Sequence, residues 1–388
     1  MRLALPLLFA LSGLGACTKG ADEGLVWPES TADAVSGYAA VVEASYADSL
    51  ADAEALHQRV LALVAAPSDS TLDDARGAWL QSREPYLQTE VYRFYDGPID
   101  NPEDGPEGLL NAWPLDEHYL DYVEGDAEAG LINDAAVTLN EDTLVSLNEA
   151  GGEKNIATGY HAVEFLLWGQ DLNDDGPGAR PYTDYVVGEG GTASNQGRRG
   201  ETLTLVSGLM LTHLGQVHDA WAPGAAYRAD FEANPEASFA KILTGMIVLS
   251  GFETGGERLQ ASLDSGDQED EHSCFSDNTH RDMVQDVRGV LNVWEGQYTR
   301  LDGSTVSGVS VKAIVEEVAP DLAASLDAQI HESLTLAEAL QAPYDQEIAP
   351  GNAEGNARVQ ALVVSLRAQE ELLFEVFTAF ELTVEIPE

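Results

Sequence analysis

The sequence predicts an all-α protein built from two antiparallel helical bundles that pack against each other. Apolar residues recur at spacings of three and four along most of the 388-residue chain, as they do in amphipathic helices. No stretch of the sequence sustains the alternation of apolar and polar residues that is typical of a half-buried strand. The two cysteines, Cys17 and Cys274, do not supply a disulfide framework, so apolar packing must hold the bundles together.

Residues 1–16 have the features of a signal peptide. A basic head precedes an apolar run over 3–14, which is too short to span a bilayer. Small residues stand directly before Cys17, as a lipoprotein signal peptidase requires; the alternative is an ordinary signal peptide with a chance cysteine after it. We expect a lipidated Cys17, a tether over 17–30, and a membrane-surface protein. Thr18 favours the outer membrane, facing the periplasm or the cell surface, because an aspartate there would signal inner-membrane retention.

The first predicted bundle spans residues 31–190. Its longest helix ends before Pro67, and Ser70 with the following aspartates opens the next helix. Gly, Pro and Asp are concentrated over 97–108, which predicts a loop. The expected helices lie at 35–64, 70–94, 115–123, 131–147 (as one helix or two short ones) and 158–167.

The second predicted bundle spans residues 191–388, after a loop-rich stretch over 171–199. Its segment 239–259 is apolar around much of the helix circumference, which predicts burial. The expected helices lie at 198–221, 239–259, 279–294, 309–318, 322–340 and 357–380.

The charge balance excludes one class of partner and favours another. The chain has 19 Lys and Arg against 67 Asp and Glu, a net charge of −48. Nucleic acid is excluded because contacts to phosphate need a basic surface. Cations are favoured as ligands, although a solvated acidic surface adapted for solubility or high salt explains most of these carboxylates.

The strongest candidate site is the pair His161 and Glu164, two polar residues in an otherwise apolar helix. Residues three apart share one helix face, so the imidazole and the carboxylate project together into a region suited to burial. A bound metal would offset the cost of burying them, with iron, zinc or another borderline ion suited to these ligands. The alternative is a structural His–Glu hydrogen bond in the bundle core.

Three other segments carry candidate ligands. Residues 268–280 hold two His, two Asp, two Glu and a Cys, although a solvated acidic loop before the next helix is the plainer explanation. Arg93, among aromatic residues, is suited to pairing with a carboxylate or binding an anionic group. Asp171, Asn173 and Asp175 match the first half of a calcium loop, but the position of the bidentate Glu is taken by a tyrosine, so an ordinary turn is the alternative.

Several segments, in this order and at these separations, resemble the imelysin-like family, and in particular its iron-regulated protein A branch. They are Trp79–Glu90, Tyr92–Asp100, Asn111–Glu117, Gly159–Asp171 and Glu269–His280, and the fourth contains the family signature Gly-x-His-x-x-Glu. The resemblance covers about residues 38–373. It implies two helical bundles, export, a role in iron acquisition, and a site between the bundles that includes the positions of His161 and Glu164.

The leading hypothesis is therefore an exported protein that binds a metal ion or an iron chelate, with iron as the first candidate and zinc as the second. Beyond His161 and Glu164, the expected ligands are Glu90, then Asp277 and His280. Other envelope proteins of iron uptake are the expected partners. A metallopeptidase of restricted specificity is the second hypothesis, although no helix carries the His-Glu-x-x-His pattern of a zinc peptidase. A protein-interaction module with a structural His–Glu pair is the third.

Overall fold

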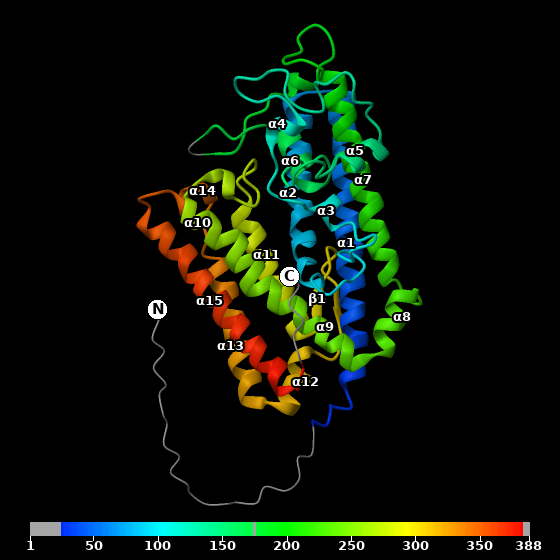
Figure 1. Ribbon diagram of the computed structural model, residues 1–388, viewed down its shortest axis with the longest axis vertical. Helices are drawn as coiled ribbons and strands as arrows, with labels where there is room; N and C mark the ends of the chain where they lie inside the picture. Colours follow the sequence, from blue (N-terminus) through cyan, green and yellow to red (C-terminus); the bar gives the residue numbers. More distant parts are fainter. Residues whose placement is uncertain (1–24, 174–175, 383–388) are drawn as a thin grey trace, which may run out of the picture.

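The structure, a computed structural model, describes residues 25–173 and 176–382 and confirms the predicted all-α architecture of two bundles (Figure 1). Four helices of the first bundle run side by side, with α1 and α7 the longest. These are α1 (Thr31–Ala65), α2 (Asp69–Leu87), α6 (Gly159–Trp168) and α7 (Gln196–Trp221). Short helices lie in the connections: η1 (Glu90–Tyr92), α3 (Glu107–Leu110), α4 (Glu117–Leu120), α5 (Glu141–Leu147) and η2 (Tyr182–Tyr185).

The second bundle is formed by α11, α13, α15 and one long composite helix. The composite helix begins as α9 (Pro235–Ile247), continues as the π-helix η3 (Val248–Gln260) and ends as α10 (Ala261–Ser265). The others are α11 (Thr279–Glu295), α13 (Pro320–Ala337) and α15 (Ala353–Ala379). Shorter elements are α8 (Ala226–Ala233), η4 (Gln268–Asp270), α12 (Val311–Val318), α14 (Tyr344–Ile348) and the hairpin β1 (Gln297–Thr299) with β2 (Thr305–Ser307).

Three predicted helices are clearly longer in the sequence analysis than in the structure, and of the segment 115–123 only Glu117–Leu120 is helical. The helix expected to reach residue 94 ends at Leu87, two residues after Pro85, which lacks the N–H that the helical ladder needs. In the segment 131–147, only Glu141–Leu147 is helical. The side chains of Asn133 and Asp134 hydrogen-bond to nearby backbone groups there and so stabilise turns instead of a helix.

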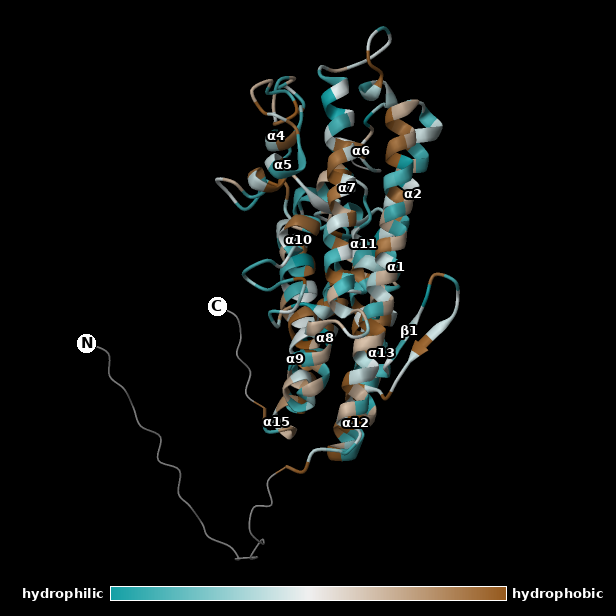
Figure 2. Ribbon diagram, turned by 90° about the vertical axis from the view of Figure 1, so that its right-hand side faces the viewer, coloured by the Kyte–Doolittle hydropathy of each residue, from teal (hydrophilic) through white to brown (hydrophobic). Residues whose placement is uncertain are grey.

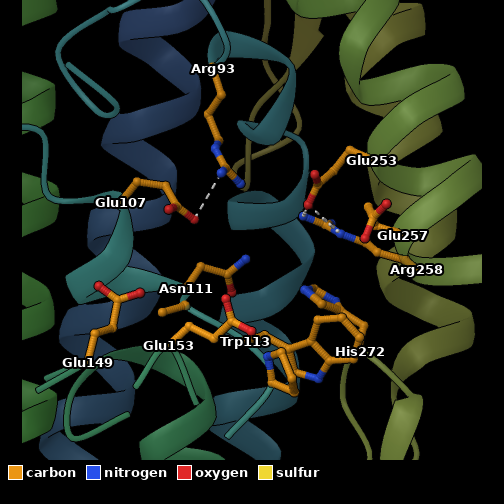
Figure 3. Close-up of a pocket in the computed structure, with 12 residues that line it drawn as sticks. Arg93, Glu107, Asn111, Trp113, Glu149, Glu153, Glu253, Glu257, Arg258 and His272 are labelled. Atoms are coloured by element: carbon orange, nitrogen blue, oxygen red, sulfur yellow. Dashed lines mark hydrogen bonds and ion pairs between the residues drawn. The ribbon is translucent and has the colours of Figure 1, made fainter. Parts of the chain in front are cut away.

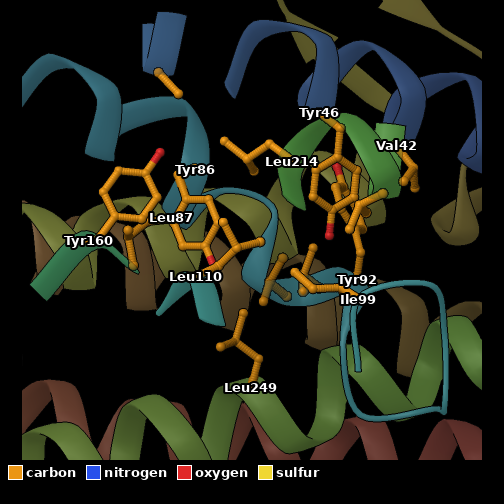
Figure 4. Packing of buried hydrophobic residues seen from close by; sticks show 14 of the residues in the cluster. Val42, Tyr46, Tyr86, Leu87, Tyr92, Ile99, Leu110, Tyr160, Leu214 and Leu249 are labelled. Carbon is orange, nitrogen blue, oxygen red and sulfur yellow. The ribbon is translucent and has the colours of Figure 1, made fainter. Parts of the chain in front are cut away.

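A large hydrophobic cluster extends across both bundles, and a smaller one lies within the second bundle. The rings of Tyr86 and Tyr160 lie 4.5 Å apart, and Leu249 of η3 faces this layer from the second bundle (Figure 4). The long helices are striped, with hydrophobic and hydrophilic bands along their length (Figure 2). The bundles approach each other closely at Gly245 of α9 and Gly289 of α11, where a Cβ atom would overlap the carbonyl oxygen of Val91 in the first case and would lie 2.6 Å from that of Gln88 in the second. Only glycine allows α11 to pack this tightly against the end of α2.

Helix α7 begins after residue 190, where the sequence predicts the boundary between the two bundles, yet it packs against α1 and α6 of the first bundle. The position of this boundary stays a prediction. None of the helices in the described residues combines the length and the apolar character needed to cross a bilayer.

Candidate functional site

The candidate site is built on α6, whose first residue is Gly159. Its φ is +84°, and a Cβ atom there would lie 2.5 Å from the carbonyl oxygen of Leu110. The glycine of the Gly-x-His-x-x-Glu pattern is therefore required by the backbone and by the tight contact with α3. It sets the direction of α6, which places His161 and Glu164 in the interior, where both are almost completely buried.

His161 and Glu164 contact each other directly. His161 Nδ1 lies 2.9 Å from Glu164 Oε2, while Glu164 Oε1 accepts hydrogen bonds from the backbone N and the hydroxyl of Ser276, at 3.0 and 2.6 Å. Burial raises the pKa of Glu164 to about 8, and burial together with nearby Arg83 holds the pKa of His161 well below its usual range. His161 Nε2 is buried and has no hydrogen-bond partner among the described residues. This nitrogen is the one atom of the pair left over for a ligand.

A second histidine, His272, lies against the first. The rings of His161 and His272 are 4.9 Å apart and nearly perpendicular. His272 Nδ1 lies 2.7 Å from Asp282 Oδ2, so its ring is held by a buried carboxylate, as the ring of His161 is. Burial and nearby Arg258 lower the pKa of His272 to about 4, so this imidazole is neutral at neutral pH. Sequence reasoning assigned no role to this residue.

Arg83 ties this second histidine to the first bundle. Its Nη2 donates to Asp282 Oδ2 at 2.9 Å and its Nη1 to Asn111 Oδ1 at 2.6 Å. Arg83 and Asp282 are both buried, and the Arg83 guanidinium is the chief group that holds the pKa of Asp282 well below its usual range against the effect of burial. The ion pair joins α2 to α11 and fixes Asp282 behind His272.

A cavity of about 380 Å³ opens between the bundles beside His272 (Figure 3). We call it the cleft. Its lining is mostly polar and comes from α3 and its flanking loops, from the loop before α6, from the π-helix η3 and from the segment before α11. The lining residues are Arg93, Glu107, Asn111, Ala112, Trp113, Pro114, Glu149, Glu153, Glu253, Glu257, Arg258 and His272.

Glu90 and Arg93 lie at the side of the cleft in a network of ion pairs. Glu90 Oε2 accepts from Arg93 Nη1 at 2.7 Å and from Arg258 Nη2 at 2.6 Å. Burial would raise the pKa of Glu90, but the two guanidinium groups lower it to about 2. Arg93 also pairs with Glu107 at 3.1 Å, so it neutralises carboxylates, one of the two roles expected of it. Glu90 Oε1 is buried without a partner.

Asp277 and His280 do not join this arrangement. Among the described residues, no hydrogen bond or ion pair links either side chain to His161 or Glu164. His280 Nδ1 contacts the backbone oxygen of Asp277 at 3.1 Å. The buried Asp277 carboxylate has no hydrogen-bond partner in the part of the chain that the structure describes, and burial together with Asp171 and Asp345 raises its pKa to about 7. Asp277 therefore belongs to a separate acidic corner.

Two predicted sites fall partly or wholly outside the described residues. Cys17 lies in the segment 1–24, and Asp175 of the predicted calcium loop also lies outside the described residues. Asp171 Oδ1 accepts from the backbone N of Asn173, as in an ordinary turn. Within the described part of the chain, no three His, Cys, Asp or Glu side chains come close enough together to hold a metal ion by themselves.

The residues that sequence reasoning missed are those whose partners lie far along the chain. Arg258 reaches Glu90 across 168 positions, and Arg83 reaches Asp282 across 199. Only His272 had a signal, because it lies in the segment 268–280 that stood out for its potential ligands. Which histidine of that segment faces the cleft is decided by the packing of α11, which the local pattern does not contain.

Comparisons with known proteins agree with this architecture. A family model described as Imelysin matches residues 42–373. A relative named Iron-regulated protein A, from Synechococcus elongatus, is 25% identical over 312 residues, which cover 80% of this chain and 75% of that protein. A solved structure designated an iron-regulated protein A precursor, from Parabacteroides distasonis, has a TM-score of 0.70 and 20% identity, covering 93% of this chain and 98% of that chain. An imelysin-like protein from Psychrobacter arcticum has a TM-score of 0.62 and 14% identity, covering 93% and 99%.

Proposed function

The chain belongs to the imelysin family, and on that premise we propose that it binds iron as a cargo between its two helical bundles, at His161 and His272. The predicted resemblance to this family is confirmed, and an iron-related role holds at the level of the family. One observation carries the proposal: His161 Nε2 is buried without a hydrogen-bond partner. Buried polar atoms are nearly always paired, and a metal–nitrogen bond would satisfy this one.

The two imidazoles have the arrangement of metal ligands whose rings are held by buried carboxyl groups. Glu164 fixes Nδ1 of His161 and Asp282 fixes Nδ1 of His272, which leaves Nε2 of each ring for an ion. The lowered pKa of each histidine keeps it in the neutral form that binds metal. A metal–nitrogen bond of about 2.1 Å places the centroids of two ligating rings roughly 5 Å apart. The observed separation of 4.9 Å fits this requirement.

In this proposal Glu164 supports a ligand and is not itself one. Its Oε2 contacts His161 and its Oε1 accepts two hydrogen bonds from Ser276, so both of its oxygens are already engaged. Two histidines leave several coordination positions of an iron ion open. Water or a chelating molecule in the adjacent cleft would occupy them, which is consistent with the lack of a third protein ligand in the described residues.

The test is iron binding by the mature protein without an affinity tag, measured by metal analysis after equilibrium dialysis and by competition titration. We expect one iron per chain, and a loss of affinity of at least 100-fold in both His161→Ala and His272→Ala. His331→Ala is the matched control, because His331 is half-exposed on α13, away from the cleft. Unchanged iron occupancy in both cleft variants would overturn the proposal. Cleavage of a diverse peptide mixture, lost on chelation, would favour the metallopeptidase instead.

We also propose that the protein is exported and held at the outer membrane by a lipid on Cys17. The support is the sequence alone, where a short apolar run and two small residues precede this cysteine. Cys17→Ser is expected to abolish acyl labelling and to move the protein from the membrane fraction to the soluble fraction. A variant that stays in the membrane fraction would refute the anchor and leave the iron site untouched.

A further inference from the structure

Resting on the proposed function, we propose that the cleft selects cationic iron species, either the hydrated ion or a positively charged complex, and excludes anionic chelates. The cleft in Figure 3 is the space that any group accompanying the iron must occupy. Its electrostatic character therefore decides which form of iron can reach His161 and His272.

The lining of the cleft carries an excess of negative charge. Five glutamates, Glu107, Glu149, Glu153, Glu253 and Glu257, line it, against only two arginines. A concave site lined by one sign of charge between low-dielectric walls concentrates ligands of the opposite sign.

Both arginines of the cleft are engaged by carboxylates, and the unpaired Nε of Arg93 is buried away from solvent. Arg93 pairs with Glu90 and Glu107. Arg258 pairs with Glu90 at 2.6 Å, with Glu253 at 2.9 Å and with Asp286 at 2.9 Å. An anion could recruit these guanidinium groups only by leaving buried carboxylates unpaired, which is strongly unfavourable.

Three of the five lining glutamates face solvent and have no cationic partner. Glu149, Glu153 and Glu257 are exposed, and no ion pair joins them to a Lys, Arg or His in the described part of the chain. Figure 3 shows Glu149 and Glu153 on one side of the cleft and Glu257 across from them. An incoming cation would meet these carboxylates first, whereas a citrate-like chelate would meet like charge.

The inner end of the cleft offers a different chemistry. Asn111 is only 4% exposed, and its Oδ1 is engaged by Arg83 at 2.6 Å. Its Nδ2 has no hydrogen-bond partner, although the residue lines the cleft. Beside it stands His272. An N–H donor suits an oxygen-bearing group, and an imidazole suits the metal ion that this group accompanies. The cleft is therefore acidic at its mouth, and at its base it offers groups that bind the metal ion and its companion.

The test uses two exchange-inert octahedral complexes, hexaamminecobalt(III) and hexacyanoferrate(III), which carry charges of +3 and −3. Neither complex has an open coordination position for a histidine, so calorimetry reports selectivity for charge without any contribution from coordination to the protein. We expect the cation to bind and the anion not to bind at physiological salt. We also expect the affinity for the cation to fall as salt is added.

The acidic surface elsewhere also attracts cations, so matched variants are essential. The triple variant Glu149→Gln, Glu153→Gln, Glu257→Gln should lower the affinity for hexaamminecobalt(III) at least tenfold. The control triple is Glu54→Gln, Glu128→Gln, Glu332→Gln, which removes the same charge from exposed positions outside the cleft lining. It should change the affinity for hexaamminecobalt(III) less than twofold. Equal effects of the two triples, or binding of the anion to the wild-type protein, would overturn the inference.

The two proposals can fail separately. His161→Ala should abolish iron binding and leave hexaamminecobalt(III) binding unchanged, because the inert complex needs no ligand from the protein. Loss of hexaamminecobalt(III) selectivity with intact iron binding would refute only the charge inference. Intact selectivity with iron binding that survives in both histidine variants would refute only the iron site.

Discussion

Two buried polar clusters lie in the first bundle and at its border, and they differ in how completely they are paired. Around Asp121, Oδ2 accepts from Arg180 at 2.8 Å and from Arg199 at 2.6 Å, and Oδ1 accepts from Arg199 at 2.9 Å. Around His161, by contrast, the imidazole Nε2 has no partner. Both clusters are sealed from solvent.

The contrast separates a structural cluster from a binding site. A carboxylate with both oxygens bound by arginines has no lone pair to offer and serves to hold loops and helices together. A buried imidazole that is oriented on one nitrogen and free on the other is costly unless a ligand completes it. Burial and charge alone therefore do not mark the site, and neither does an unpaired atom by itself, because Arg180 Nε is also unpaired among the described residues. The site is marked by an unpaired atom that can bind a metal, as an imidazole nitrogen can and a guanidinium N–H cannot.

The largest effect is expected from the paired cluster. Asp121→Asn would leave Arg180 and Arg199 buried with their shared counter-charge removed, which costs about 3–5 kcal/mol of unfolding free energy. Urea unfolding followed by circular dichroism measures this loss. Asp230→Asn, an exposed aspartate on α8, serves as the control and should be neutral. A change in Asp121→Asn as small as in the control would show that pairing at this cluster is not structural.

The unpaired cluster should respond in the opposite way, with a loss of binding and little loss of stability. Glu164→Gln keeps the shape of the side chain but weakens the hold on His161 Nδ1, so iron affinity should fall about 10–100-fold. The pKa of Glu164 is raised by burial to about 8, so a neutral amide is tolerated there in the folded state. Competition titration and thermal melting measure the two quantities. A parallel loss of both would make Glu164 a structural residue.

The sequence predicted the long elements and the centre of the site, for identifiable reasons. Helices α1 and α15 each exceed 25 residues, and their apolar periodicity is unambiguous. His161 and Glu164 were recognisable because they interrupt an apolar helix at a spacing of three. Both signals are local, and local patterns are what a sequence shows directly.

The remainder depends on contacts between distant segments. The hairpin β1–β2 has strands of three residues, too short to show alternation, and η1 follows a helix that ends at Leu87. His272 could not be preferred over His280, because the choice depends on Asp282 and on Arg83 of the other bundle. The predicted ligand Asp277 lies instead with Asp171, from the loop after α6, and with Asp345 of α14.

The pH dependence of stability at this acidic corner provides the next test of the comparison between paired and unpaired groups. Burial together with Asp171 and Asp345 raises the pKa of Asp277 to about 7 in the folded protein, against roughly 3.9 for an unfolded aspartate. Between these values the folded state binds more protons, so stability falls as pH rises from about 4 to about 7 and stays lower above that. Asp277→Asn should remove this dependence and stabilise the protein at pH 8 by about 1–3 kcal/mol. Urea unfolding at several pH values measures the pH dependence of the unfolding free energy. An unaltered slope in Asp277→Asn would contradict the prediction.

The smallest effect is expected for a partly exposed ion pair between α2 and α11, the two helices that the buried pair Arg83–Asp282 also joins. Glu84 and Arg281 pair at 2.7 Å next to the buried pair Arg83–Asp282, yet their side chains are 30% and 39% exposed. Solvent screens this pair, so Glu84→Gln should cost less than about 1 kcal/mol, although the geometry matches that of the buried pair. Urea unfolding of Glu84→Gln beside Asp282→Asn makes the comparison at one interface. A loss in Glu84→Gln as large as in Asp282→Asn would show that the distance between charges, and not their burial, governs the strength of pairing in this molecule.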